Sequence, residues 1–375
     1  MVWVPKKVLF SATVVSHINA FHLPYLKWFR DQGWEVHVAA NGSEPVPWAD
    51  KQFDIPIQRS PYSRDNLKAL RELKRIIDSQ GYEIIHCHTP MGGVLTRLAA
   101  RQSRRKGTKV VYTAHGFHFY KGASRINWLI YYPVEKWLSR YTDVLVTMND
   151  EDFERAKRGK FKPGLIHFVH GVGISFERFK PPTAEQKRQL REEYGVGQDR
   201  FVLIYAAEMI HRKNQTLLLE TIQKLKDAIP NVQLLLAGKG KLEAFYKSLV
   251  AEKGLEPYVT FLGHRKDMEN IYALADVAVS SSRQEGLPVN IMEAIASGLP
   301  VVATRVRGNR DLVGEGVHGF LVELGDADAF ADRILQLYHD PLLRQEIAAR
   351  RDLLTGTYAI ENVLEELTSV YKDRM

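Results

Sequence analysis

Short runs of apolar residues alternate along the chain with longer segments whose apolar positions follow a helical spacing. Twelve of the apolar runs are predicted to be strands: residues 7–15, 35–40, 84–88, 110–114, 144–148, 165–169, 201–206, 232–237, 259–262, 277–280, 301–303 and 319–322. Helical patterns separate most of them, as at residues 66–80, 215–228, 241–253 and 327–339. Apolar strands that alternate with helices are typical of parallel sheets covered on both faces. Twelve strands exceed a typical open sheet, so we expect two sheets.

A Pro181-Pro182 pair marks the expected boundary between the two sheets, because proline continues neither a helix nor a central strand. We therefore predict an α/β protein with two Rossmann-like domains, residues 1–180 and 181–357. In such sheets ligands bind beyond the carboxyl ends of the strands. The tail, residues 358–375, has apolar residues spaced along one helical face, and we expect this C-terminal helix to pack on the first domain.

Residues 280–303 read as strand, loop, helix, turn and strand. Pro288 suits the first turn of the helix and Gly298 its C-terminal cap. The helix then presents backbone N–H groups near residues 286–289, which suits a phosphate. Glu285 lies just before the helix, and Glu293 lies slightly more than one turn inside it. A carboxylate at such a place can accept two hydrogen bonds from a ribose diol.

This segment resembles the E-x7-E signature of family-4 retaining glycosyltransferases of the GT-B fold, and the resemblance covers nearly the whole chain. Further motifs carry it, although His170 and Gly173 replace an asparagine and an aspartate of the family pattern: His170-Gly171-Val172-Gly173, Gly238-Lys239-Gly240, Gly263-His264, Gly308-Asn309-Arg310-Asp311 and Gly319-Phe320-Leu321-Val322. The opening residues 12–17 and the Gly-Asn-Arg-Asp motif are most similar to bacterial exopolysaccharide and capsule glycosyltransferases.

The resemblance implies a nucleotide-sugar donor, with UDP as the nucleotide, whose leaving diphosphate is met by basic groups. Lys213 matches the family lysine. Glu208 stands where the family has an arginine, and a carboxylate there would repel a phosphate. Either Glu208 points elsewhere or Arg212 supplies the second positive charge. This departure leaves open whether the diphosphate site is impaired or re-tuned.

The other donor-site roles also follow from the resemblance. Glu285 is expected at the donor sugar or beneath the reaction centre, and Glu293 at the ribose. Gly263 is expected near the base, and Gly286-Leu287-Pro288 around the phosphates. The family reaction is a front-face displacement in which the leaving phosphate helps to deprotonate the acceptor. We therefore expect no covalent nucleophile and no cofactor.

Histidines dominate the candidate site of the first domain. His115 follows a strand and matches the family histidine near the donor sugar, so we assign it a catalytic role. His17 and His118 are assigned to the acceptor. His86 and His88 lie on one face of a strand and, with His115 and His118, suggest zinc. Parallel strands rarely aim four imidazoles at one point and no thiolate pair assists them, so we predict no metal.

The net charge is +8, and it is unevenly distributed. The first 180 residues carry 28 Lys and Arg and 16 Asp and Glu, whereas the remainder has an excess of four acidic residues. A single cysteine, Cys87, excludes an internal disulfide framework. Basic and aromatic residues are interleaved over residues 117–140, which suits a membrane interface. The resemblance implies a lipid-diphosphate-linked acceptor, and we expect a cytoplasmic protein at the inner face of the membrane.

Three other functions fit the sequence less well. A UDP-sugar 2-epimerase shares the fold, but it would leave the basic, aromatic first domain unexplained. An NAD-dependent dehydrogenase requires Gly-x-Gly-x-x-Gly after the first strand, where this chain has Ser16-His17-Ile18-Asn19. Nucleic-acid binding is not expected, because the basic residues are scattered and no recognised motif is present. The donor sugar, the linkage and the oligomeric state stay open.

Overall fold

The computed structural model describes residues 5–373 and divides them into two compact units. The first unit comprises residues 5–172 and 361–373, and the second comprises residues 173–360. Each unit contains one sheet of parallel strands with helices on both faces. The α/β class and the two sheets expected from the apolar runs are confirmed.

The first unit contains a seven-stranded sheet with the order β3-β2-β1-β4-β5-β6-β7. Its strands are β1 (Lys7–Val14), β2 (Glu35–Asn41), β3 (Lys51–Asp54), β4 (Ile84–His88), β5 (Lys109–Ala114), β6 (Val144–Thr147) and β7 (Leu165–Phe168). The central strands are buried on both faces, as their continuous apolar runs predict. The strand order reverses between β1 and β4, which places a topological switch point at their carboxyl ends.

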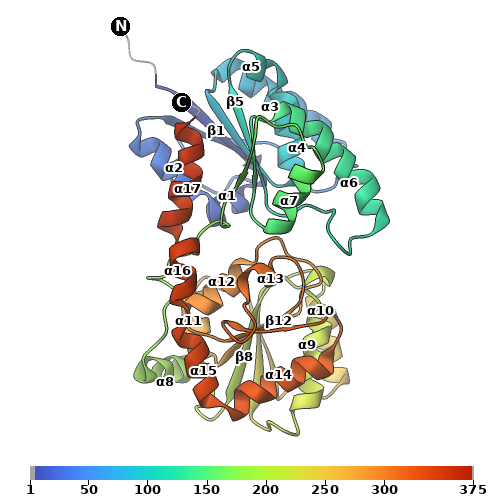
Figure 1. Ribbon diagram of the computed structural model, residues 1–375, viewed down its shortest axis with the longest axis vertical. Coiled ribbons are helices and arrows are strands. Elements are labelled where there is room, and N and C mark those ends of the chain that lie inside the picture. The colour runs from blue at the N-terminus through green and yellow to red at the C-terminus, as the bar shows by residue number, and fades with distance from the viewer. Residues whose placement is uncertain (1–4, 374–375) are drawn as a thin grey trace. The chain divides into compact units, whose positions relative to one another are not determined.

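Helices cover both faces of this first sheet. They are α1 (Val15–Phe21), α2 (Leu23–Asp31), α3 (Asp65–Gln80), α4 (Pro90–Ala99), α5 (Arg101–Arg105), α6 (Arg125–Leu138), α7 (Asp150–Arg158) and α17 (Ile360–Lys372). In Figure 1, α2 and α17 lie on one side of the sheet and α3, α4 and α6 on the other. One apolar cluster unites α2 and α17 with β1 through Phe10, Phe29 and Tyr371. The C-terminal helix therefore completes the core of the first unit.

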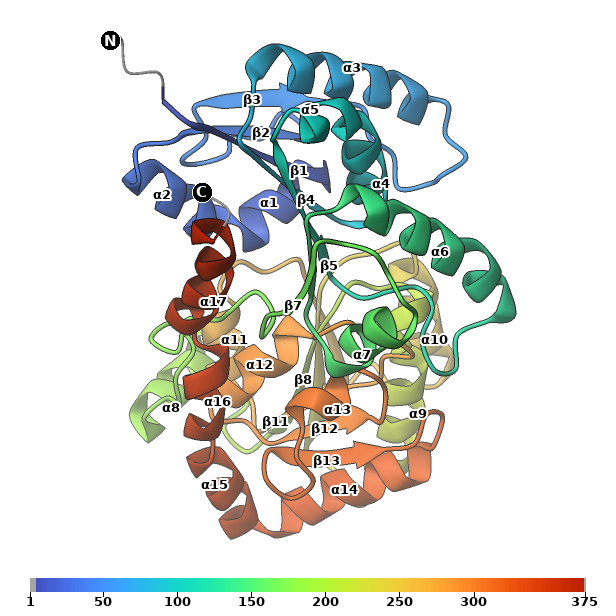
Figure 2. The same cartoon turned by 45° about the horizontal axis from the view of Figure 1, so that its top comes forward.

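The second unit contains a six-stranded sheet with the order β10-β9-β8-β11-β12-β13. Its strands are β8 (Phe201–Ala206), β9 (Val232–Ala237), β10 (Val259–Gly263), β11 (Val277–Ser280), β12 (Val301–Thr304) and β13 (Gly319–Val322). Figure 2 shows β8, β11, β12 and β13 following one another across the sheet. The order reverses between β8 and β11, so the loops after these two strands flank the switch point of this unit.

The helices of the second unit also form two layers. They are α8 (Ala184–Glu193), α9 (Gln215–Leu225), α10 (Glu243–Glu252), α11 (Met268–Leu274), α12 (Val289–Ala296), α13 (Asn309–Leu312), α14 (Ala327–His339), α15 (Pro341–Ala349) and α16 (Asp352–Tyr358). One core cluster packs α9, α10 and α14 against the sheet, and a second packs α11, α12 and α16 against its other face. Short 3-10 turns cover Ser139–Tyr141 in the first unit and His211–Lys213 in the second.

Several boundaries differ from the prediction. The units divide at Val172 rather than at Lys180, because Ile174 and Phe179 pack in the core of the second unit. Strand β3 was missed, since its residues Lys51–Asp54 are mostly polar and lie at the sheet edge. The C-terminal helix is interrupted at Ala359, whose backbone is extended, so α16 ends before α17 begins. Within residues 5–373, no helix combines the length and the apolar character needed to cross a bilayer.

Candidate functional site

A charged cluster lies at the carboxyl ends of β8 and β11 in the second unit. The Nζ of Lys213 donates to Oε1 of Glu285 at 2.5 Å. The Nη1 of Arg212 lies 3.4 Å from Oε2 of the same carboxylate. Glu285 is buried, whereas 44% of the Arg212 side chain is exposed. The structure therefore brings together two basic residues and the first glutamate of the candidate donor site.

Opposing effects set the ionisation of Glu285. Burial raises the pKa of its carboxyl group, but the positive charges of Lys213 and Arg212 and hydrogen bonds from Lys213 and Ser282 lower it further than burial raises it. The Oγ of Ser282 lies 2.5 Å from Oε1 of Glu285. The pKa of Glu285 consequently lies below its ordinary value, and the carboxylate is charged at neutral pH.

The backbone of Lys213 is fixed by residues that were not singled out from the sequence. The Oγ of Ser281 donates to the Lys213 carbonyl at 2.9 Å, and the Tyr205 hydroxyl donates to it at 3.1 Å. Tyr205 also lies 2.8 Å from Ser282, the serine that contacts Glu285. Ser281 and Ser282, which follow β11, are the sequence signal for these contacts, because buried polar side chains need hydrogen-bond partners.

The loop that carries Glu285 is also held by the segment after β12. Arg307 is buried, and its Nε donates to the Glu285 carbonyl at 3.0 Å. Gly308 has φ +79°, and a side chain there would collide with the Gly286 carbonyl. Gly308, the first residue of the Gly-Asn-Arg-Asp motif, therefore supports the loop that carries Glu285 by close backbone packing, and this approach requires glycine.

The loop leads into α12, which begins at Val289 with Pro288 as its N-cap rather than in its first turn. The first hydrogen bond of the helix runs from the Ile291 N–H to the Pro288 carbonyl at 3.2 Å. The N–H groups of Val289 and Asn290 precede that bond and so point out of the helix end, where an anion is favoured. The predicted phosphate site at this helix end therefore has the required backbone donors.

Glu293 lies in the middle of α12 and is half-buried. The Tyr272 hydroxyl donates to its Oε2 at 3.3 Å. Burial raises the pKa of Glu293 to about 7, against weaker lowering by Tyr272 and Arg178. A carboxylate with few fixed partners and a raised pKa is typical of a group that binds a ligand.

Two glycine turns border this site. The Gly238 N–H donates to the Gly263 carbonyl at 2.7 Å, which ties the end of β9 to the end of β10. A side chain at Gly238 would collide with the Ala207 carbonyl, so the Gly-x-Gly turn packs directly against the loop after β8. Glu208 in that loop is exposed, and its carbonyl accepts from Gln215 at 3.1 Å. Arg212, rather than residue 208, stands beside Glu285 in the second unit.

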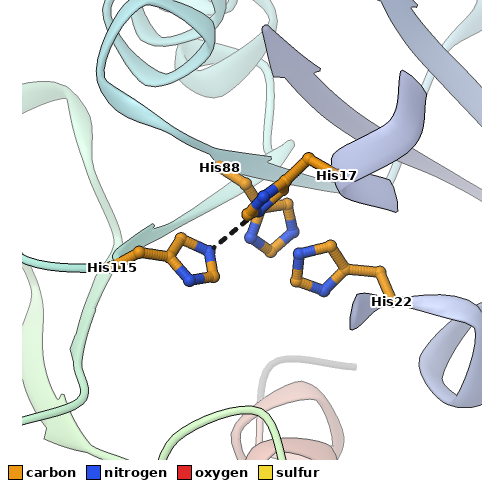
Figure 3. Close-up of side chains that lie close together, drawn as sticks. All are labelled: His17, His22, His88 and His115. Carbon is orange, nitrogen blue, oxygen red and sulfur yellow. Dashed lines mark hydrogen bonds between the residues drawn. The ribbon is translucent and has the colours of Figure 1, made fainter. Parts of the chain in front are cut away.

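The first unit gathers imidazoles at the carboxyl ends of β1, β4 and β5. Nitrogen atoms of His17, His22, His88 and His115 all lie within 4.8 Å of one another. Figure 3 shows the four rings turned toward a common centre, with Nε2 of His17 and Nε2 of His115 at 3.2 Å. His118 is not among them, because it packs against Tyr131 with ring centroids 4.7 Å apart. Thus His17 and His115 lie together, and His118 lies elsewhere in the unit.

The turn His170-Gly171-Val172-Gly173 spans the unit boundary, and its two departures from the family pattern both contact the C-terminal segment. The backbone N–H of His170 donates to Glu366 at 3.0 Å, and its Nδ1 lies 2.7 Å from the same carboxylate. This contact fastens α17 to the first unit. Gly173 has φ +73°, and a side chain there would collide with Ile360. His170 and Gly173 therefore both contribute to the packing of the C-terminal segment.

Comparisons with known proteins identify the family of the chain. The family model described as glycosyl transferases group 1 matches residues 186–351, and the model described as glycosyl transferase 4-like matches residues 7–149. A candidate glycosyltransferase, EpsD of Bacillus subtilis (strain 168), is 48% identical over 99% of this chain and 97% of its own length. The Escherichia coli UDP-Gal:alpha-D-GlcNAc-diphosphoundecaprenol alpha-1,3-galactosyltransferase is 28% identical over 82% of this chain and 80% of its own.

Solved structures share the fold. The Anabaena protein Alr3699/HepE in complex with UDP and glucose has a TM-score of 0.81 at 19% identity, covering 98% of this chain and all of that chain. The lipopolysaccharide-biosynthesis glycosyltransferase WaaG has a TM-score of 0.76 at 15% identity, covering 97% of this chain and 99% of that chain.

Two units, each built on a parallel sheet with surrounding helices, define the GT-B class. The chain belongs to the GT-B glycosyltransferases related to enzymes of polysaccharide biosynthesis. It is a transferase of the hexosyltransferase type, and the matches do not favour the 2-epimerase alternative.

Proposed function

We propose that this chain transfers a hexose from a UDP-sugar, with retention of anomeric configuration, to a lipid-diphosphate-linked acceptor of exopolysaccharide or capsule synthesis. The observation that carries the proposal is the pairing of Lys213 and Arg212 with the buried Glu285 beside the start of α12. The second unit is assigned to the nucleotide sugar and the first unit to the acceptor, at the inner face of the membrane.

In this proposal the donor diphosphate binds where positive charge is concentrated. Lys213, Arg212 and the N–H groups that open α12 meet the negative charge that develops on the leaving group. Gly263 lies near the base, and Glu293 accepts hydrogen bonds from the ribose hydroxyls. Glu285 orients Lys213 and Arg212 and lies beside the donor sugar. These groups stabilise the leaving diphosphate with charge that belongs to the protein itself.

The chemical step is a front-face displacement. The bond between C1 of the sugar and the phosphate oxygen breaks, and the acceptor oxygen bonds to C1 on the same face. The acceptor proton passes to an oxygen of the leaving diphosphate, so atoms and charge balance without a covalent enzyme intermediate. His115 is assigned to the donor sugar, and His17 and His118 to the acceptor side.

The acceptor assignment rests on the surface of α6. The helix exposes large apolar side chains in a row, namely Ile126, Leu129, Ile130, Val134 and Trp137. At its end a pocket of about 250 Å³ is lined by Lys136, Arg140, Lys160 and Lys162 together with aromatic rings. Apolar side chains flanked by cations suit the interface of an anionic membrane. The name of the Escherichia coli relative includes a diphosphoundecaprenol-linked sugar, which is consistent with this surface.

The test is a donor and acceptor scan with the full-length protein. UDP-, GDP- and ADP-sugars are offered with a short-chain lipid-diphosphate sugar, and nucleoside diphosphate release is followed with product analysis by NMR. We expect transfer from a UDP-sugar, an unchanged anomeric configuration, and loss of transfer in Glu293→Ala. Inversion at C1 would refute retention, and turnover with GDP- or ADP-sugars alone would refute UDP.

A further inference from the structure

We propose that His17, His22, His88 and His115 form a binding site for one divalent transition-metal ion, with zinc as the chemical prototype. The site goes beyond the proposed function, which draws its positive charge from Lys213 and Arg212. The four residues come from four places in the first unit: α1, the junction of α1 with α2, the last residue of β4, and the residue after β5. Such convergence on one point is the arrangement that a metal ion requires.

In the described part of the chain, His22 and His88 have unsatisfied ring nitrogens. His22 and His88 are buried, with exposed fractions of 1% and 0%. Both nitrogens of each ring have no hydrogen-bond partner within residues 5–373. A buried imidazole normally pairs its N–H group and its lone pair, so two adjacent unpaired rings call for a bound group. Figure 3 shows these rings facing each other and the ring of His115.

His86 provides an internal comparison. Its ring lies next to His88, with centroids 4.0 Å apart, but its Nδ1 lies 2.5 Å from the Tyr371 hydroxyl and its Nε2 lies 2.7 Å from Thr113. The fold therefore satisfies a buried histidine where it has partners to offer. The sequence suggested His86 and His118 as companions of His88 and His115, and the structure replaces them with His17 and His22.

The distances between the four histidine nitrogens are slightly longer than those around a bound metal ion. Zinc binds imidazole nitrogen at about 2.0–2.1 Å, so four tetrahedral ligand atoms lie roughly 3.3 Å apart. The most distant of the four nitrogens here lie within 4.8 Å, and His17 and His115 are already 3.2 Å apart. To reach bonding distance, the rings would have to rotate about their side-chain bonds, and the stacked rings of His22 and His88, with centroids 3.7 Å apart, would have to separate. The ion would replace the contact between His17 and His115.

The chemistry of the ligand set favours a cation over an anion. Burial lowers the pKa values of His22, His88 and His115 well below the ordinary value of histidine. Burial lowers the pKa of His17 to about 4, and the positive charge of Arg59 adds to this shift. The rings are therefore neutral at physiological pH and hold a free lone pair. Neutral imidazole suits zinc, copper, nickel and iron. Because His22 and His88 lack outer partners, we expect affinity about 10–100-fold weaker than that of a fully supported site.

Metal binding would change the role of the His115 side chain. As a metal ligand, its ring is fixed in place, and its backbone stays available to the donor sugar. His17 would then act through the metal site rather than directly on the acceptor.

The test uses untagged full-length protein that has been dialysed against a chelator. Zn²⁺ and Co²⁺ are titrated, with Co²⁺ absorption reporting coordination geometry and elemental analysis reporting stoichiometry. We expect one ion per chain, visible bands of a tetrahedral cobalt site, and a higher melting temperature with Zn²⁺. His88→Gln and the half-buried His17→Gln should lose all three effects, and His167→Gln, a histidine of β7 outside the cluster, should keep them.

Circular dichroism first establishes that each variant is folded, and His17→Gln serves if His88→Gln is not. Folded wild-type protein that binds neither ion, or both cluster variants binding like wild type, would overturn the proposal. Stabilisation of wild type by inorganic pyrophosphate but not by Zn²⁺, lost in both cluster variants, would also overturn it and identify an anion site. None of these measurements uses transferase activity, so failure here is distinguishable from failure of the proposed function.

Discussion

The Nζ of Lys213 and the Oε1 of Glu285 lie 2.5 Å apart, although the two residues follow different strands of the second sheet. Lys213 ends the 3-10 turn after β8, and Glu285 lies in the loop after β11. These strands pair with each other, and the strand order of the sheet reverses between them. The ion pair therefore bridges the switch point of the unit, where ligands of such sheets bind.

Lys213→Met should separate the catalytic and structural roles of this pair. In the proposed function, removal of the ammonium takes one positive charge from the leaving diphosphate, and we expect turnover to fall by about 10²–10³-fold. The variant also leaves Glu285 buried with only Arg212 opposite, so the free energy of unfolding should fall by up to about 3 kcal/mol. Donor turnover and urea denaturation measure the two effects.

The double variant Lys213→Met/Glu285→Gln provides the control. Without a buried charge it should regain most of the lost stability, yet it should stay inactive, because the diphosphate still lacks the lysine. Lys241→Met removes an exposed lysine of the same unit and should change neither quantity. Full activity in Lys213→Met would exclude the lysine from the reaction.

Glu293 should make stability depend on pH. Its pKa is raised from 4.5 to about 7 in the folded protein, so the folded state holds a proton that the unfolded chain releases at lower pH. Stability contributed by the protonated group is therefore present below about pH 4.5 and is lost as the pH rises to about 7. The free energy of unfolding of Glu293→Gln, measured relative to that of wild type, should therefore increase by about 3 kcal/mol as the pH rises from about 4.5 to about 8.

The same ionisation should govern donor binding. In the proposed function ionised Glu293 accepts hydrogen bonds from the ribose, so the KM for the donor should fall as the pH rises through about 7. Glu293→Gln should raise the KM and remove this pH dependence. Glu252→Gln, at an exposed position of α10, should follow wild type in both denaturation and kinetics. A wild-type KM that is flat from pH 6 to pH 8 would contradict the assignment.

Much of the fold, and the clustering of the candidate donor-site residues, could be predicted because the signals are local. Continuous apolar runs predict central strands, and the spacing of Glu285 and Glu293 depends only on one loop and one helix. The edge strand β3 has no such signal, because its residues Lys51–Asp54 are largely polar. The division at Val172 was also missed, since it depends on packing of Ile174 and Phe179 rather than on proline.

The histidine cluster could not be predicted, because it depends on contacts between distant segments. His86 and His88 look equivalent on one strand, but Tyr371 of α17 and Thr113 of β5 satisfy only His86. His22 lies at the junction of two helices that the apolar pattern did not resolve. No spacing along the sequence indicates that its ring stacks on His88 with centroids 3.7 Å apart.

The exposed face of α6 should bind anionic membranes. Leu129 is 76% exposed and Trp137 is 43% exposed, and basic residues flank them. We expect the wild-type protein to float with vesicles of phosphatidylglycerol and phosphatidylcholine, and less so at high salt. The double variant Leu129→Glu/Trp137→Glu should lose flotation, because it places two carboxylates against the bilayer.

Leu353→Glu provides the matched control for that experiment, since Leu353 is 64% exposed but lies on α16 of the second unit. It should float like wild type. Equal flotation of the α6 double variant and wild type would remove α6 as the membrane-binding face. Flotation on neutral vesicles alone would rule out the role of the basic residues.

Gly308→Ala should disturb the donor loop through the backbone alone. Gly308 has φ +79°, and an added Cβ would collide with the Gly286 carbonyl beside Glu285. Gly316 has φ +69° with open space around it, so Gly316→Ala carries the same kind of backbone strain without the collision. We expect a loss of about 1 kcal/mol for Gly316→Ala and about 2–3 kcal/mol for Gly308→Ala. Only Gly308→Ala should also raise the donor KM, by roughly 10-fold, because it alone moves the loop that carries Glu285. Equal effects of the two substitutions on stability and KM would show that the Gly308 contact does not position the donor site.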